Sequence, residues 1–143
     1  MEEVTEVPFG VPCKTRIWFS RRVQEEVARF RKKGDPNGAF WKRLKRHAEN
    51  GLWTAEHGSP PPVQAEWDGV YRLGYVDTLF RIIGFYEDAS KSDFIAIDAY
   101  LKKGRKLNDP QRERINYVAA VKKERRWKKV NHVQYPRLAE GSE

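Results

Sequence analysis

The 143-residue chain has one cysteine, Cys13, only three histidines, and no run of 18 apolar residues. A single cysteine excludes an internal disulfide and suits a reducing compartment. The histidines (His47, His57 and His132) are not spaced as metal ligands, with one another or with Cys13. The lack of a long apolar run argues against a transmembrane helix, and the acidic start MEEVTEVPFGVP is unlike a secretory signal. We therefore expect a soluble, cytoplasmic protein with no metal, no cofactor and no membrane partner.

Positive charge is plentiful and unevenly distributed along the chain. The sequence holds 28 Lys and Arg against 20 Asp and Glu, a net charge of +8. Residues 102–129 contain twelve basic and three acidic side chains, a net charge of +9, so the remainder is close to neutral. Localised basicity of this kind is typical of proteins that bind nucleic acid. The alternative is a solvated helix face whose lysines have no specific partner.

Hydrophobic periodicity and capping residues predict a single domain over residues 14–127. The predicted elements are a strand at 14–19, a helix capped by Ser20 and ended by Gly34, a second helix opened by Asp35 or Asn37 and ended by Gly51, strands at 63–68, 70–76, 79–87 and 93–101, and a helix from Asp109 as N-cap and Pro110 to about Trp127.

The order of these elements predicts an α+β fold. Short turns between the later strands favour an antiparallel sheet of about four to five strands, with the helices covering one face. Residues 1–13 are acidic and contain two prolines, so we expect an N-terminal arm. Residues 128–143 form a C-terminal tail that the pattern does not place.

Two arginines interrupt the predicted strands. Arg72 lies in VYRLGY and Arg81 in LFRIIGFY, where both faces of the strand are apolar. Arginine keeps its charge in such surroundings and needs an anion or hydrogen-bond acceptors. An internal partner such as Asp98 or Glu66 and a phosphate of a ligand are equally compatible with this pattern. Several aromatic residues near the cations are candidates for stacking on unpaired bases, or for the core: Tyr71, Tyr75, Tyr86, Tyr100 and Trp127.

Residues 66–124 resemble a known protein family. The segments EWDGVYRLGYV, LFRIIGFYED and DFIAIDAYLKKGRKLNDPQRERINYVAAVKKE are similar to the RelE/HigB-type toxins of type II toxin–antitoxin modules, especially the phage-derived HigB-like branch. FRIIGFYE corresponds to the family's second strand element, IAIDAYLKK to the strand that ends in a double lysine, and LNDPQRERINYVAAVKK to the final helix. The close similarity covers somewhat under half of the chain.

The resemblance implies a RelE-like, microbial-RNase-like fold and ribosome-dependent cleavage of mRNA in the ribosomal A site. The cut would follow attack by the neighbouring 2′-hydroxyl, and the partners would be a cognate antitoxin, the message and the ribosome. The residues implied in catalysis are Arg81, Lys102, Lys103, Arg72 and Tyr86. Those expected to bind RNA are Arg105, Lys106, Lys122, Lys123 and Arg126.

The sequence departs from the family pattern at one strand. Where the family has aromatic–Glu–Leu–Arg, this chain has Tyr71, Arg72, Leu73 and Gly74, so glycine replaces the expected arginine. None of the histidines matches the acid/base histidine of some HigB-like members. Two alternatives therefore stay open: a ParE-like inhibitor that binds a protein such as gyrase and cuts no RNA, and a non-toxic basic nucleic-acid-binding protein of phage origin.

Overall fold

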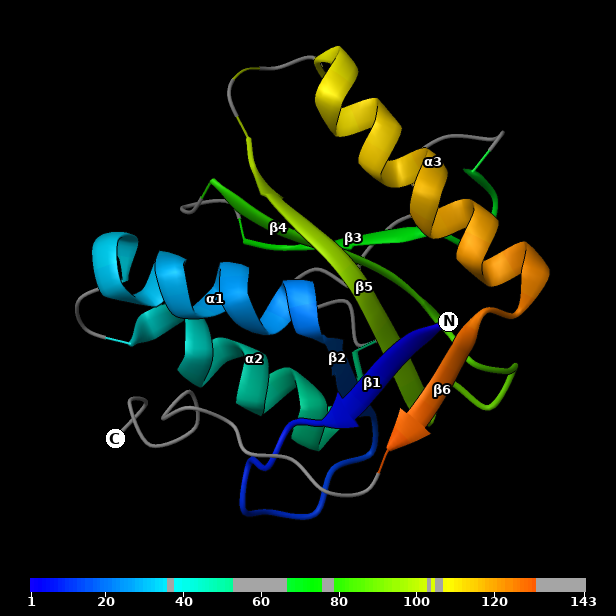
Figure 1. Ribbon diagram of the computed structural model, residues 1–143. Coiled ribbons are helices and arrows are strands. Elements are labelled where there is room, and N and C mark those ends of the chain that lie inside the picture. The colour runs from blue at the N-terminus through cyan, green and yellow to red at the C-terminus, as the bar shows by residue number, and fades with distance from the viewer. Residues whose placement is uncertain (36–37, 53–66, 76–78, 103, 105–106, 131–143) are drawn as a thin grey trace.

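The computed structural model describes residues 1–35, 38–52, 67–75, 79–102, 104 and 107–130. Its elements follow one another as β1 (Glu2–Glu6), β2 (Arg16–Ser20), α1 (Arg21–Gly34), α2 (Ala39–Asn50), β3 (Tyr71–Leu73), β4 (Phe80–Tyr86), β5 (Asp93–Leu101), α3 (Asp109–Glu124) and β6 (Trp127–Val130) (Figure 1). The coarse prediction of an α+β protein is confirmed. Within the described residues, no helix combines the length and apolar character needed to cross a lipid bilayer.

The described strands form one mixed sheet of six strands in the order β3-β4-β5-β2-β1-β6. The pairs β3–β4, β4–β5 and β1–β2 are antiparallel, whereas β2–β5 and β1–β6 are parallel. The prediction of an antiparallel sheet of four to five strands was therefore wrong in both direction and number. Short turns identified the hairpin strands, but the parallel pairs join segments far apart in the sequence, which local patterns do not reveal.

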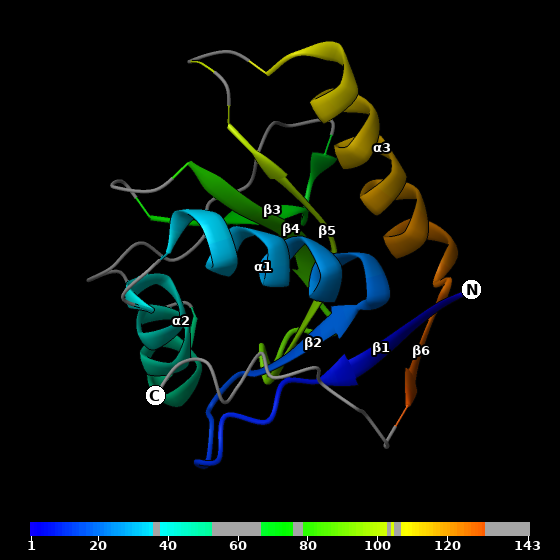
Figure 2. The same cartoon turned by 60° about the vertical axis from the view of Figure 1, so that its left-hand side comes forward.

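The helices cover both faces of the sheet. On one face, α1 and α2 pack over a cluster that includes Phe19, Trp41 and Phe80. On the other, α3 packs through Ile115 and Val118 over a second cluster (Figure 2). The expectation that the helices lie on one face was wrong, because strand residues alternate between faces and both faces of β4 and β5 are apolar.

Both terminal segments contribute strands. The N-terminal residues expected to form an arm include β1, where Val4 is fully buried and the Glu2 amide donates to the Arg126 carbonyl at 2.8 Å. The acidic residues of this segment concealed the strand. At the other end, β6 crosses the expected boundary at residue 127, so residues 128–130 belong to the sheet.

The second and third helices begin close to their predicted starts, but with different N-cap residues. At α2 the N-cap is Gly38 in a left-handed conformation, and the carboxylate of Asp35 accepts the Phe40 amide at 3.2 Å. At α3 the N-cap is Asn108, one residue earlier than expected. Asn108 and Gln111 each bond to the other's backbone amide, at 2.9 and 3.1 Å, forming a capping box. This reciprocal pair explains why Asn108 displaces Asp109 as the cap.

The α1 cap makes a stability prediction. The Ser20 hydroxyl accepts the Val23 amide at 3.2 Å and donates to the Ile97 carbonyl at 2.8 Å, in a fully buried position. We expect Ser20→Ala to lower the free energy of unfolding by about 2 kcal/mol, since it removes a cap and a buried hydrogen bond together. Urea denaturation measures the loss. The exposed Ser90→Ala should stay within about 0.5 kcal/mol of wild type, and equal losses in the two variants would contradict this role.

Candidate functional site

Three of the cations proposed for catalysis come from neighbouring strands. Arg72 of β3 pairs with Ile83 of β4, and Arg81 of β4 pairs with Tyr100 of β5. Since side chains alternate along a strand, Arg72, Arg81 and Tyr100 share the face on which α3 packs. Lys102 follows β5 directly, and its amide donates to the Leu79 carbonyl at 2.6 Å. The backbone therefore brings these cations to one end of the sheet.

Arg81 is half-buried and held by the backbone. Its Nη1 donates to the Phe80 carbonyl at 2.9 Å and to the Tyr75 carbonyl at 3.4 Å. Burial lowers the pKa of Arg81, Tyr100 raises it, and the charge of Arg72 lowers it further. The positive charges of Arg72 and Arg81, which lie on adjacent strands, therefore repel each other. A bound anion would relieve this repulsion.

The departure at Gly74 has a steric reason. A Cβ atom at Gly74 would lie 2.6 Å from Cδ of Arg81, 2.7 Å from the Phe80 carbonyl oxygen and 2.8 Å from Nη1 of Arg81. The side chain of Arg81 therefore occupies the space that a larger residue at Gly74 would need. In this chain, glycine at position 74 allows the guanidinium of Arg81 to lie close against β3–β4.

Sequence reasoning named Tyr100 only as an aromatic residue near the cations and Asp98 only as a candidate partner of Arg81, without placing either one. Tyr100 is 3% exposed, and its hydroxyl is buried without a hydrogen-bond partner in the described structure. The Asp98 carboxylate accepts hydrogen bonds from Nε of Arg22 and from the Ala99 amide, each at 2.7 Å. Nη1 of Arg114 donates a hydrogen bond to the Ala99 carbonyl at 2.5 Å. The strand register opposite Arg81 is the signal that would have found Tyr100, and it is not readable from the sequence.

The carboxyl group of Asp98 has a raised pKa. Burial raises it, and the Ala99 amide, Arg22 and Arg114 only partly oppose that effect. Asp98 was one of the internal partners considered for Arg81, but in the structure its ion pair is with Arg22 of α1. The other considered partner, Glu66, lies outside the described residues. Arginines from α1 and α3 thus converge on the same stretch of β5.

The basic run at 102–129 is divided by α3. Lys122 and Lys123 lie in the last turn of this 16-residue helix, about 20 Å along its axis from its start, and Arg126 follows the helix. Lys122 lies against Gly69, where an added Cβ would meet its Cε at 2.8 Å. Nε of Arg126 lies 3.0 Å from the Glu124 carboxylate. The sequence run is therefore not one continuous patch, and part of its charge serves internal contacts.

Tyr86, also predicted to act in catalysis, does not lie at this end of the sheet. Tyr86 faces the α1 side and packs on Tyr71 and Phe94, with ring centroids 5.4 and 5.3 Å apart. It also lies five residues, about 17 Å, along β4 from Arg81. Burial is the main cause of its raised pKa. The placements expected for Lys103, Arg105 and Lys106 fall outside the described residues.

Within the described residues, no group of three or more His, Cys, Asp and Glu side chains is arranged to hold a metal ion. His47 is buried, and its Nδ1 lies 2.8 Å from the Tyr75 hydroxyl. His57 and His132 lie outside the described part of the chain. Comparisons with protein-family models, with curated proteins and with solved structures found no match to this sequence or fold.

Proposed function

We propose that this protein is a toxin of a toxin–antitoxin module, a ribosome-dependent mRNA endonuclease of the RelE/HigB type. The observation that carries the proposal is that Arg72 and Arg81 share one sheet face and that Lys102 follows β5 at the same end of the sheet. The sequence resemblance over residues 66–124 supports the same assignment. Lys103, Arg105 and Lys106, which follow in the chain, would extend the phosphate-binding surface.

The proposed chemistry suits residues of this kind. The 2′-oxygen attacks the adjacent phosphorus as its proton leaves, and the 5′-oxygen departs with a proton, which gives a 2′,3′-cyclic phosphate and a 5′-hydroxyl. Negative charge grows on the phosphate oxygens in the transition state. Arg81, already oriented by the carbonyls of Phe80 and Tyr75, can stabilise that charge with little reorganisation. Arg72 and Lys102 would hold the same phosphate from the neighbouring strands.

A test compares Arg81→Ala and Lys102→Ala with wild type during tightly repressed expression in bacteria. We expect wild type to arrest growth and to create new mRNA 5′ ends within minutes. Each substitution should slow cleavage of ribosome-bound message in vitro by about 10²–10³-fold, because it removes a fixed cation from the transition state. The exposed Lys128→Ala, on the distant β6, is the matched control. Cleavage that is equally fast in Arg81→Ala and Lys128→Ala would refute the assignment of the site.

A second candidate function is a ParE-like inhibitor that binds a protein and cuts no RNA. Gly74 favours it, because the arginine expected from the nuclease pattern is missing and the space is occupied by Arg81. Growth arrest with intact message would support this function. No arrest, with folded protein present, would support a non-toxic nucleic-acid-binding role. If the protein is the nuclease toxin, we expect its cognate antitoxin to present acidic residues to the cations at this end of the sheet.

A further inference from the structure

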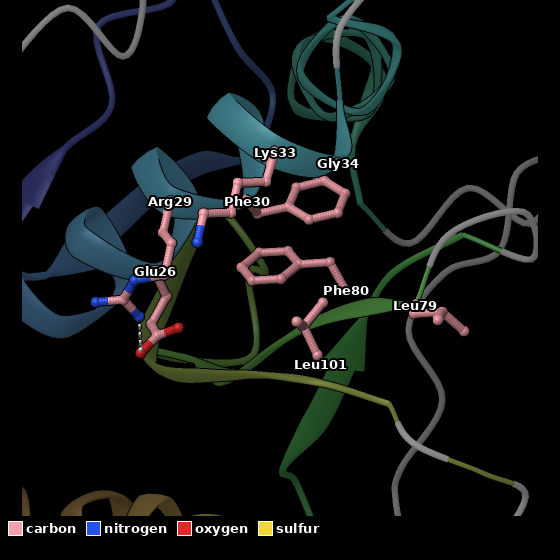
Figure 3. Close-up of a pocket in the computed structure, with 8 residues that line it drawn as sticks. All are labelled: Glu26, Arg29, Phe30, Lys33, Gly34, Leu79, Phe80 and Leu101. Carbon is pink, nitrogen blue, oxygen red and sulfur yellow. Dashed lines mark ion pairs between the residues drawn. The ribbon is translucent and has the colours of Figure 1, made fainter.

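An apolar groove lies on the opposite sheet face from the cations, between α1 and the ends of β4 and β5 (Figure 3). Its volume is about 470 Å³. Phe30 of α1 stacks on Phe80 of β4, with ring centroids 4.6 Å apart and planes 10° from parallel. Leu101 lies beside Phe80, its cross-strand partner, and Leu79 completes the apolar lining.

Two leucines of this groove are unusually exposed. Leu79 is 60% exposed and Leu101 is 51% exposed. In the described part of the chain, only Met1 and Tyr117 are other large hydrophobic residues with comparable exposure. Leu101 and the stacked aromatic pair together leave apolar side chains open at this groove, and Leu79 lines its end, with its side chain pointing away from Phe80 (Figure 3). Exposed apolar groups gathered at one place in a monomer typically mark an interaction surface.

The rim of the groove is positively charged. Arg29 and Lys33 project from α1 along its edge, and the carboxylate of Glu26 is paired with Arg29 at 3.0 Å and Arg22 at 3.8 Å. Among the described residues, no ion pair involves Lys33, which is exposed. The groove therefore combines an apolar floor with unneutralised positive charge on one side, which complements an acidic amphipathic partner.

The neighbouring edge of β5 is closed to an added strand. Beyond the end of β2, the β5 carbonyls that face away from β4 already accept side-chain donors. The Ile97 carbonyl accepts a hydrogen bond from the Ser20 hydroxyl, the Ala99 carbonyl from the Arg114 guanidinium, and the Leu101 carbonyl from the Gln111 side-chain amide at 3.0 Å. A partner here must satisfy its own backbone groups, as a helix does. The α1 residues that line the groove, from Glu26 to Gly34, span about 12 Å, or roughly two helical turns.

We propose that this groove docks an amphipathic α-helix of a partner protein, with apolar side chains on one face and carboxylates flanking them. The apolar face would cover Leu101 and the Phe30–Phe80 pair, with Leu79 at the end of the groove. The carboxylates would pair with Lys33 and Arg29. This docking surface is independent of the proposed nuclease activity, since it lies on the other face of the sheet.

The test uses two synthetic helical peptides with leucines spaced i, i+4, i+7. One carries flanking glutamates, and its matched counterpart carries lysines at the same positions. Each is titrated into ¹⁵N-labelled full-length protein and followed by amide chemical shifts. We expect the acidic peptide to shift amides of the second half of α1 and of residues 79–80 and 101. It should bind at least about tenfold more tightly than the basic peptide.

Two variants make the result specific. Leu79→Ser combined with Leu101→Ser should weaken binding of the acidic peptide at least about tenfold, because two buried leucine contacts are lost. Both leucines are exposed, so this variant should keep the wild-type melting temperature. Tyr117→Ser removes an exposed aromatic residue from α3 and should leave binding unchanged. Equal binding of the two peptides, shifts confined to other surfaces, no binding, or full binding by the double variant would each overturn the proposal.

Discussion

Gly84→Ala is expected to unfold the protein or to cost more than about 4 kcal/mol of its free energy of unfolding. A Cβ atom at this position would lie 2.2 Å from the Ile95 carbonyl oxygen and 2.9 Å from Cε2 of Phe94. Gly84 sits at the register shift between β4 and β5, where the two backbones approach closely. Because β4 is held between β3 and β5, it cannot move away to relieve the clash.

The control for this substitution is Gly104→Ala. A Cβ atom at Gly104 would meet nothing within 4 Å, and the residue is exposed. Its stability should remain within about 0.5 kcal/mol of wild type. Chemical denaturation followed by circular dichroism compares the two variants. If Gly84→Ala melts like Gly104→Ala, the close approach of β4 and β5 at this point is incorrect.

Asp93→Asn is expected to be the next most damaging change, lowering the free energy of unfolding by about 3 kcal/mol. The Asp93 carboxylate accepts Nε and Nη2 of Arg16 at 2.9 and 3.1 Å and Nε1 of Trp18 at 2.8 Å. Lys129 of β6 lies 3.6 Å away and also pairs with Glu87. An amide at position 93 loses the negative charge that pairs with Arg16 and Lys129. Its NH2 group would also replace the oxygen that accepts Nη2 of Arg16, so that donor loses its partner.

The same network predicts a pH dependence. Burial alone would raise the pKa of Asp93, but the bonds from Arg16 and Trp18 and the charge of Lys129 outweigh it and lower the pKa. A carboxyl whose folded pKa is lowered stabilises the fold above its unfolded pKa, near 3.8, and loses that contribution as pH falls through the folded value. The stability difference between wild type and Asp93→Asn should therefore be largest above about pH 5 and shrink below pH 4.

Asp98→Asn is the matched comparison. Burial raises the pKa of Asp98, so its ionised form is disfavoured in the fold, and lowering the pH favours the native state through this group. Asp98→Asn should change the free energy of unfolding by no more than about 1 kcal/mol at neutral pH, because the charge it removes is disfavoured in the fold and an amide oxygen can still accept from Arg22. Urea denaturation at several pH values measures both variants. Equal losses at neutral pH would contradict the distinction between the two carboxylates.

Local patterns predicted the elements better than their assembly. Ser20 and the spacing of Val23 and Val27 define α1, and period-2 runs define β4 and β5, because these signals act within a few residues. The parallel pairing of β2 with β5 and the packing of α3 on the second face depend on contacts between distant segments. No short-range signal in the sequence encodes them.

The candidate site shows the same division. Alternation along the strands is enough to mark Arg72 and Arg81 as unusual cations among apolar residues. The neighbours of these cations required the register, because only the pairing of β4 with β5 brings Tyr100 opposite Arg81. The basic run in the sequence also suggested one continuous charged surface from Lys102 to Arg126, but α3 separates its two ends.

The parallel pairing of β1 with β6 has a consequence for synthesis of the chain. Glu2 pairs with Trp127, so β1 is synthesised more than 120 residues before the strand it pairs with on this side. At about 5–20 residues per second, that delay is roughly 6–25 seconds. During this interval the outer edge of β1 has no neighbouring strand, and exposed edges of this kind recruit other chains. Pairing of β6 with β1 is therefore the step that covers this edge of the newly made chain.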